Sequence, residues 1–237
     1  MAVMDLEALK REAARHALAQ VHDKMRLGLG TGSTARHFVD LLGLRMKQEG
    51  LQIIAVPTSD ATREQARALG IPLTTLDETP ELDMTVDGAD EVDSDLNLIK
   101  GGGGAHLREK MVALASKKLI IIADETKRVA TLGRFPLPLE VMSFGLASTQ
   151  ARLQAVLAAH GCAGPIRLRK KADGSVFLTD SGNLILDADC GVIASAPALA
   201  QALDAVTGLV EHGLFIGLAK AALLATSSGI QVMGDPA

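Results

Sequence analysis

Short apolar runs alternate with helical patterns through the first half of the chain, and this alternation limits the possible folds more than any other feature. The four runs lie at residues 25–29, 52–56, 82–86 and 118–123. Apolar residues at helical spacing predict helices at residues 6–21, 33–47, 61–69 and 105–115. Strands and helices in strict alternation form a parallel sheet with helices packed on it. We therefore predict an α/β fold with a Rossmann-like, mostly parallel sheet and helices on both faces.

From about residue 131 the pattern changes to short strands joined by glycine-containing turns. Helices are predicted at residues 148–160 and 197–203, and strands at residues 166–170, 175–182 and 183–189. This mixture indicates a smaller, inserted α+β domain. The apolar residues of 206–215 are expected to return a strand to the main sheet. The predicted domains are a catalytic α/β domain (1–130 and 206–237) and the smaller domain (131–205).

Composition excludes several classes of partner and compartment. The chain has 24 Lys and Arg against 28 Asp and Glu, and it lacks Tyr and Trp, so neither a basic surface nor aromatic platforms are available for nucleic acid. Cys162 and Cys190 have no metal-ligand spacing and are expected to be reduced thiols. The first residues lack the pattern of a signal peptide, and no apolar run approaches the ~20 residues needed to cross a bilayer. We expect a cytoplasmic protein without a nucleic-acid or membrane partner.

The segment GLGTGSTA, residues 28–35, lies where the first strand ends and a helix begins. Glycines allow a tight turn there, and the free N–H groups at a helix start favour an anion. A plain capped turn remains an alternative, and so does a dinucleotide site, because Gly30, Gly32 and Ala35 fit the alanine form of that fingerprint. A dinucleotide site also needs an acid at the end of the second strand, where residues 57–59 are Pro, Thr and Ser. A phosphate or sugar loop fits better.

An acidic segment, DGADEVDSD at residues 87–95, follows the third apolar run. Asp87 and Asp90 lie three residues apart around Gly88, so that a tight turn can direct both into one space and divide acid and base roles between them. A solvated acidic loop or a cation site is the alternative. The spacing lacks the alternating acids, central Gly and terminal Glu of an EF-hand loop, so a metal has no support.

A third segment, LIKGGGGAHLREKM at residues 98–111, places Lys100 before four glycines and a predicted helix. Four consecutive glycines cost much backbone entropy, which favours a close approach of the backbone to a ligand. Lys100 can stabilise an oxyanion, and Glu109 on the following helix can serve as a general base. Glu109 also has an ordinary alternative, a solvent-facing helix carboxylate. Taken alone, Lys127 and Lys10 are surface cations, and none of the six histidines has metal-ligand spacing.

Taken together and in order, these segments resemble the A-type ribose-5-phosphate isomerases over nearly the whole chain. The resemblance rests on GLGTGSTA, PTSDAT, VDGADEVD, LIKGGGGAHLREKM, IADETK and FPLPLEVM, with TDSGNLILD, GVIASAPAL and VEHGLF in the later part. It implies interconversion of D-ribose 5-phosphate and D-ribulose 5-phosphate through an enediolate, without a metal or organic cofactor. It also implies a place in the non-oxidative pentose phosphate pathway and a homodimer or a larger homo-oligomer.

The resemblance assigns a role to each candidate residue. Glu109 is the base that carries a proton between C2 and C1, Lys100 stabilises the negative oxygen, and Asp87 and Asp90 open the ring and move hydroxyl protons. The implied substrate-binding residues are Thr31, Gly32, Ser33, Thr34, Gly88, Ala89, Gly101, Gly102, Gly103, Lys127 and Lys10. The departures are mild: Gly104 stands where other members can carry Ala.

Two rival functions remain open from the sequence. Related α/β folds serve as sugar-phosphate-sensing effector domains without catalysis, although no helix-turn-helix segment or basic arm accompanies this chain. The other rival is an enzyme of the same broad fold acting on an amino-sugar phosphate or a thioester. An amino-sugar deaminase is expected to carry a ring-opening histidine near its acidic motif, and DGADEVD has none.

Overall fold

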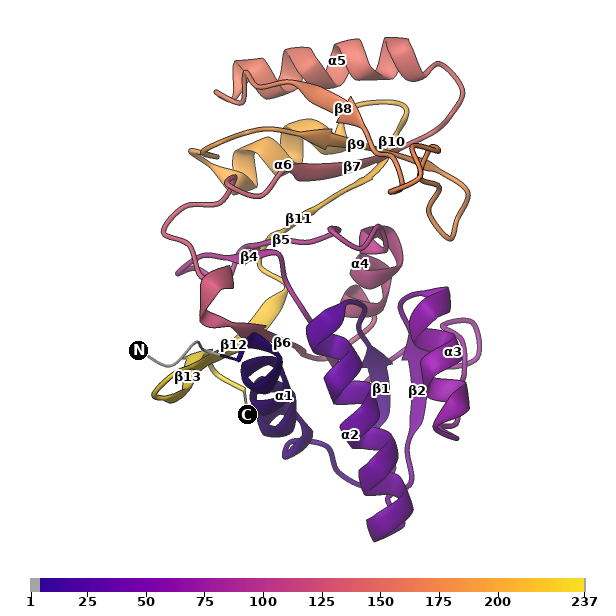
Figure 1. The fold of residues 1–237 in the computed structure, drawn as a ribbon. Helices are drawn as coiled ribbons and strands as arrows, with labels where there is room; N and C mark the ends of the chain where they lie inside the picture. Colours follow the sequence, from indigo (N-terminus) through magenta and orange to yellow (C-terminus); the bar gives the residue numbers. More distant parts are fainter. Residues whose placement is uncertain (1–4, 237) are drawn as a thin grey trace. The chain divides into compact units, whose positions relative to one another are not determined.

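The computed structural model describes residues 5–236, which divide into two compact units (Figure 1). The first unit comprises the chain up to Ala89, Arg108–Arg128, and the chain from Gly217 onward. The second unit comprises Asp90–Leu107 and Val129–Ile216. None of the described helices is both long enough and apolar enough to span a bilayer.

The first unit is built on a six-stranded sheet in the order β13-β12-β6-β3-β1-β2. The strands are β1 (Arg26–Leu29), β2 (Ile54–Pro57), β3 (Met84–Asp87), β6 (Leu119–Asp124), β12 (Ala219–Thr226) and β13 (Gly229–Gly234). All neighbouring pairs are parallel except β12 and β13, which are antiparallel. The prediction of a mostly parallel α/β sheet is confirmed.

Helices pack against both faces of this sheet, because successive strand side chains point to opposite sides. The helices are α1 (Leu6–Leu18), α2 (Ser33–Glu49), α3 (Asp60–Ala68) and α4 (His106–Leu114). Leu27 and Leu29 of β1 share one buried cluster with Phe38 of α2. Val56 of β2 shares another cluster with Val112 of α4. The two clusters lie on opposite faces, so both faces are covered as predicted.

The second unit has an antiparallel sheet in the order β10-β7-β9-β8 and a small sheet in the order β11-β5-β4. Its strands are β4 (Glu91–Val92), β5 (Leu98–Ile99), β7 (Leu137–Val141), β8 (Ile166–Leu168), β9 (Leu184–Ala188), β10 (Leu209–His212) and β11 (Leu214–Phe215). Helices α5 (Leu146–Ala159) and α6 (Ala196–Asp204) supply Leu153, Leu157, Leu199 and Leu203 to its core. A smaller α+β part is therefore present, as expected.

Two predicted strands are wrong. Residues 206–215 do not return to the main sheet, because β10 pairs with β7 and β11 pairs with β5. The place beside β6 belongs instead to β12, a mainly buried strand, and β13 follows it at the sheet edge. Residues 175–182 form only isolated bridges at Val176 and Leu178 rather than a strand.

The domain boundaries also differ from those expected from the sequence. The second unit includes 90–107 and 206–216 in addition to 131–205. The cause is the small sheet, in which β4 and β5 pair with each other and β11 pairs with β5. The sequence pattern did not predict these strands, because each has only two residues and is too short to show a strand periodicity.

Candidate functional site

Several candidate residues of the first unit lie at the carboxyl ends of neighbouring parallel strands. Thr31 follows β1, Asp87 ends β3, and Lys127 follows β6 in a short 3-10 helix, η1 (Glu125–Lys127). These strands are adjacent in the order β6-β3-β1. Ligands of open α/β sheets bind outside this edge, so the sheet places the three residues where a ligand is expected.

Asp87 is buried, and its carboxylate is held by the turn after β1. Its Oδ1 accepts hydrogen bonds from the backbone N–H of Thr31 at 3.1 Å and from that of Gly88 at 2.7 Å. Any side chain at Gly30 would collide with this same oxygen, so glycine is required for the close approach of the two turns. The backbone thus fixes the direction of the carboxylate.

Hydroxyl groups from the second strand end surround the side chain of Thr31. The Thr31 hydroxyl lies 2.7 Å from the Thr58 hydroxyl, 2.8 Å from the Ser59 hydroxyl and 3.2 Å from the Thr62 hydroxyl. Sequence reasoning gave these three partners no role, although they belong to the PTSDAT segment. Because all three are buried, they set the orientation of Thr31.

The start of α2 is open to an anion. Gly32 is its N-cap and no side chain caps the helix, so the first N–H groups, which begin at Ser33 and Thr34, have no side-chain acceptor at the cap. A pocket of about 630 Å³ opens beside it, lined by Thr31, Gly32, Ser33 and Arg36 among others. Uncapped N–H groups and the helix dipole favour a phosphate at such a place.

Glu109 lies on α4 and only 5% of it is exposed, so it is not a solvent-facing helix carboxylate. Val112, one turn further, packs over Gly28 of β1, where an added Cβ would lie 2.6 Å from the Val112 Cγ1 and would collide with Thr85. The glycine therefore lets the helix approach the sheet. The neighbouring Arg108 bonds to Asp60 at 2.8 Å and lowers the pKa of that carboxyl group.

The two outlying lysines of the first unit differ in their surroundings. Lys127 is half-buried in η1. The ammonium of Lys10 on α1 donates to Glu7 at 2.6 Å. This hydrogen bond, together with one from His37, lowers the pKa of Glu7. Lys10 is thus anchored by a carboxylate of its own helix.

The second unit holds the remaining candidates on the segment before α4. Lys100 is 2% exposed; its ammonium lies 5.5 Å from the ring centroid of Phe215, and its backbone N–H donates to the Gly213 carbonyl at 2.9 Å. The Asp90 carboxylate accepts from the backbone N–H of Gly102 at 2.7 Å. The structure therefore joins Asp90 directly to the glycine segment.

The candidates are thus divided between the units. The first unit holds Thr31, Gly32, Ser33, Thr34, Asp87, Gly88, Ala89, Glu109, Lys127 and Lys10. The second unit holds Asp90, Lys100, Gly101, Gly102 and Gly103.

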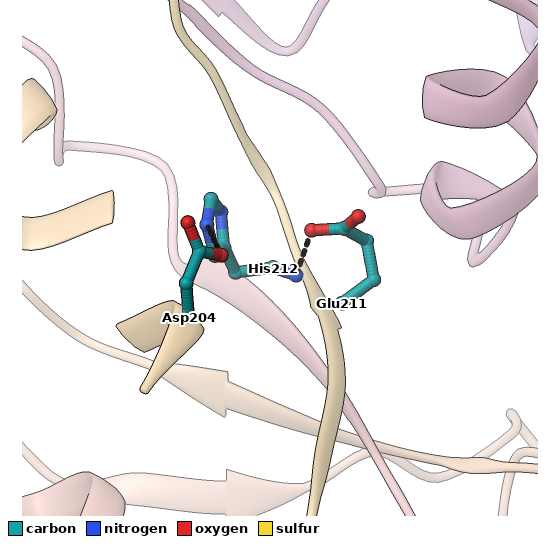
Figure 2. Close-up of side chains that lie close together, drawn as sticks. All are labelled: Asp204, Glu211 and His212. Carbon is teal, nitrogen blue, oxygen red and sulfur yellow. Dashed lines mark hydrogen bonds and ion pairs between the residues drawn. The ribbon is translucent and has the colours of Figure 1, made fainter. Parts of the chain in front are cut away.

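Among the described residues, Asp204, Glu211 and His212 form one group with metal-ligand spacing (Figure 2). The His212 Nδ1 accepts a hydrogen bond from the Leu214 backbone N–H at 3.2 Å, so the ring proton belongs on Nε2. The Nε2 lies 3.1 Å from the Asp204 carboxylate, to which it donates. The Nδ1 lone pair is thus occupied by the Leu214 N–H and Nε2 carries a proton, so neither ring nitrogen is available to a metal. We interpret the cluster as a link between α6 and β10. The absence of a metal in the reaction stays a prediction.

A family profile and the full-length relatives of this chain point to the same family. The family profile of ribose 5-phosphate isomerase A (phosphoriboisomerase A) matches residues 54–229. Ribose-5-phosphate isomerase A of Nitrobacter hamburgensis is 59% identical over 230 residues, which cover 97% of this chain and 99% of the relative.

Two solved structures extend the similarity to the fold. Ribose 5-phosphate isomerase A from Methanocaldococcus jannaschii has a TM-score of 0.88 at 36% identity, covering 97% of this chain and 99% of that one. A D-ribose-5-phosphate isomerase in complex with phospho-erythronic acid has a TM-score of 0.91 at 34% identity, covering 98% and 100%. The fold and these similarities define an isomerase. The chain belongs to the ribose 5-phosphate isomerase A family.

Proposed function

We propose that this protein interconverts D-ribose 5-phosphate and D-ribulose 5-phosphate through an enediolate. The observation that carries the proposal is the match to the family over nearly the whole chain, at 59% identity to one relative. The burial of Glu109 on α4 supports it further, because a general base works best where water is excluded. Family membership does not favour a sensing domain without catalysis.

The first step is opening of the sugar ring. Asp87 and Asp90 move a proton from the C1 hydroxyl to the ring oxygen, which frees the aldehyde. The fixed carboxylate of Asp87 suits this task, because two backbone N–H groups already hold one of its oxygens.

The second step is proton transfer between carbons. Glu109 removes the proton from C2, the electron pair forms the C1–C2 double bond, and negative charge develops on the oxygen of C1. That oxygen takes up a proton and the C2 hydroxyl releases one. Glu109 returns its proton to C1 on the same face, which yields the ketose and restores the carboxylate.

Stabilisation of the enediolate oxygen falls to Lys100 and the N–H groups of Gly101 and Gly103, while the Gly102 N–H holds Asp90. A buried ammonium and fixed amide donors supply, without a metal, the charge that a developing oxyanion needs. The reaction therefore requires neither a metal nor an organic cofactor in this proposal.

The phosphate is assigned to the first unit. The uncapped start of α2, with Thr31, Gly32, Ser33 and Thr34, offers N–H and hydroxyl donors, and Lys127 and Lys10 add positive charge. Gly88 and Ala89 contact the substrate beside Asp87. Phospho-erythronic acid, bound by the similar isomerase, combines a phosphate with a carboxylate, and the latter resembles an enediolate in charge and shape.

The assembly, the location and the metabolic role are also proposed from membership of the family. We propose a homodimer or a larger homo-oligomer, a cytoplasmic location and a role in the non-oxidative pentose phosphate pathway. Size-exclusion chromatography with light scattering tests the assembly.

Turnover after removal of metals tests the reaction. The purified protein is dialysed against a chelator, given D-ribose 5-phosphate, and the formation of D-ribulose 5-phosphate is followed. We expect full activity that added divalent metals do not raise. Binding of the sugar phosphate without turnover would support the sensing alternative and overturn the proposal.

A further inference from the structure

Arg169 binds the backbone of the glycine segment from within the second unit. It lies directly after β8, and its Nη1 donates to the Gly101 carbonyl at 2.8 Å and to the Gly102 carbonyl at 3.2 Å. The Gly101 carbonyl also accepts from the Gly104 N–H at 2.9 Å, so both of its lone pairs are used. Two consecutive peptide groups are thus fixed by one side chain.

The guanidinium itself is held on its other sides. Its Nε donates to the Asp187 carboxylate at 2.8 Å, its Nη2 donates to the second oxygen of the same carboxylate, and its Cζ lies 5.8 Å from the ring centroid of Phe177. Only 13% of the Arg169 side chain is exposed. A two-point bond to a carboxylate fixes the plane of a guanidinium, so Arg169 is a rigid support.

This support also determines where the amide protons point. The peptide bonds are trans, so each N–H lies opposite the carbonyl of the preceding residue. The Gly101 carbonyl points to Arg169, and the Gly102 N–H on the opposite side donates to Asp90 at 2.7 Å. The Gly102 carbonyl also points to Arg169, so the Gly103 N–H is directed away from it. The Arg169 contact therefore sets both the bond of the Gly102 amide to Asp90 and the direction of the Gly103 amide.

We propose that Arg169 is a positioning residue that directs the Gly103 amide to the enediolate oxygen and the Gly102 amide to Asp90. The inference rests on the proposed function, since it assigns the Gly103 amide to the same oxyanion and Asp90 to the same ring opening. Arg169 does not touch the substrate and acts only through the backbone that it orients. Misdirected amides would stabilise the transition state less but would affect binding of the sugar little. We therefore expect kcat to fall while KM changes little.

A purely structural ion pair is the competing explanation, and the chain offers a matched control for it. Arg167, two residues earlier, pairs with Asp189 from the same two strand segments. Its side chain is 64% exposed and forms an ion pair with Asp189 rather than with the glycine segment. Replacing Arg167 removes an arginine–carboxylate pair from the same sheet without releasing the Gly101 or Gly102 carbonyl.

The experiment measures kcat and KM with D-ribose 5-phosphate for wild type, Arg169→Ala, Arg169→Lys and Arg167→Ala. We expect Arg169→Ala to lower kcat ~10–100-fold with KM within ~3-fold, as for a lost oxyanion support. Arg169→Lys should stay impaired, because an ammonium cannot hold the carboxylate fork and both carbonyls. Guanidinium ion, added below denaturing concentration, should restore part of the kcat of Arg169→Ala, and Arg167→Ala should match wild type throughout.

The outcomes separate the inference from the proposed function. Inactive wild type would defeat the proposed function itself. Active wild type with normal kcat in Arg169→Ala, or with equal losses in Arg169→Ala and Arg167→Ala, would overturn the role of Arg169. If Arg169→Ala does not fold, Arg169→Lys decides: a kcat equal to wild type overturns the inference, and a lowered kcat at unchanged KM supports it.

Discussion

The two units hold their candidate residues by different means. In the first unit, Thr31, Asp87 and Lys127 follow parallel strands, so the main-chain ladder of the sheet places them. In the second unit, residues 101–104 lie outside any helix, and the side chains of Arg169 and Asp90 bond to the backbone of Gly101 and Gly102. A sheet edge tolerates changes in single side chains, whereas a segment fixed by a few side chains does not.

Substitutions in the two units should therefore affect different properties of the protein. Changes to the packing of the first unit should alter stability and the placement of Glu109 together. Changes around the glycine segment should alter the rate with little effect on unfolding.

Loss of the base should have the largest effect. We expect Glu109→Gln to lower kcat ~10²–10⁴-fold, because the amide cannot accept the C2 proton. Steady-state kinetics measure the change. Glu64→Gln on α3, which removes an exposed carboxylate paired with Arg67, is the control and should match wild type. A near-normal rate for Glu109→Gln would place the proton transfer on another residue.

Loss of the buried cation in the second unit should come next. We expect Lys100→Met to lower kcat ~10²-fold or more with a smaller change in KM, because the charge acts on the developing oxyanion. The methionine keeps an apolar side chain beside Phe215, and thermal unfolding checks that packing survives. Lys117→Met, at a lysine whose side chain is 66% exposed, serves as the control. A change confined to KM would make Lys100 a substrate anchor only.

Packing between β1 and α4 should show the coupled behaviour of the first unit. We expect Gly28→Ala to lower the free energy of unfolding by about 1–3 kcal/mol, because the new methyl group meets Thr85 and Val112 in a filled core. Since α4 carries Glu109, kcat should fall as well. Urea unfolding and kinetics are measured on the same preparation. A destabilised variant with unchanged kcat would show that this packing does not position the base.

The smallest effect is expected at Asp83, beside the amino ends of the strands. Arg26 and Lys117 bond to Asp83, and the Arg26 hydrogen bonds hold the pKa of this carboxyl group well below its usual range. A lowered pKa in the folded state stabilises the protein above the ordinary aspartate pKa, and this contribution is lost as the pH falls through the folded-state pKa.

We therefore expect Asp83→Asn to cost about 1 kcal/mol of unfolding free energy at pH 7, a modest value for a partly exposed pair. The difference from wild type should shrink on acidification to pH about 3. Urea unfolding at both pH values measures it, and kcat should not change. A difference that grows on acidification would contradict the assigned ion pairs.

The main strands of the sheet were predictable because each is a short apolar run before a turn. The four predicted runs correspond to β1, β2, β3 and β6 within about two residues. The missed strand β12 reads AKAALLAT and is mainly buried, so it has no alternation of apolar and polar residues to indicate a strand. Residues 206–215 were assigned to the main sheet instead, since their apolar content alone does not specify a partner strand.

Candidate residues could be named from the sequence where they lie close to glycine-rich turns, and their roles stay predictions. Asp87, Lys100 and Glu109 stand out as chemical groups next to glycine turns. Arg169 did not, because its contacts with Gly101 and Asp187 span 68 and 18 residues. Such pairings depend on strand register and tertiary packing, which the local sequence does not reveal.

Isomerisation in D₂O shows whether an enediolate forms by removal of the C2 proton. The product is examined by NMR after partial conversion of unlabelled D-ribose 5-phosphate. We expect deuterium at C1 of D-ribulose 5-phosphate, entering through the carboxyl group of Glu109 while the enediolate persists. A product without deuterium at C1 at every extent of conversion, together with a normal rate for Glu109→Gln, would indicate direct hydride transfer from C2 to C1 and would contradict the role of Glu109.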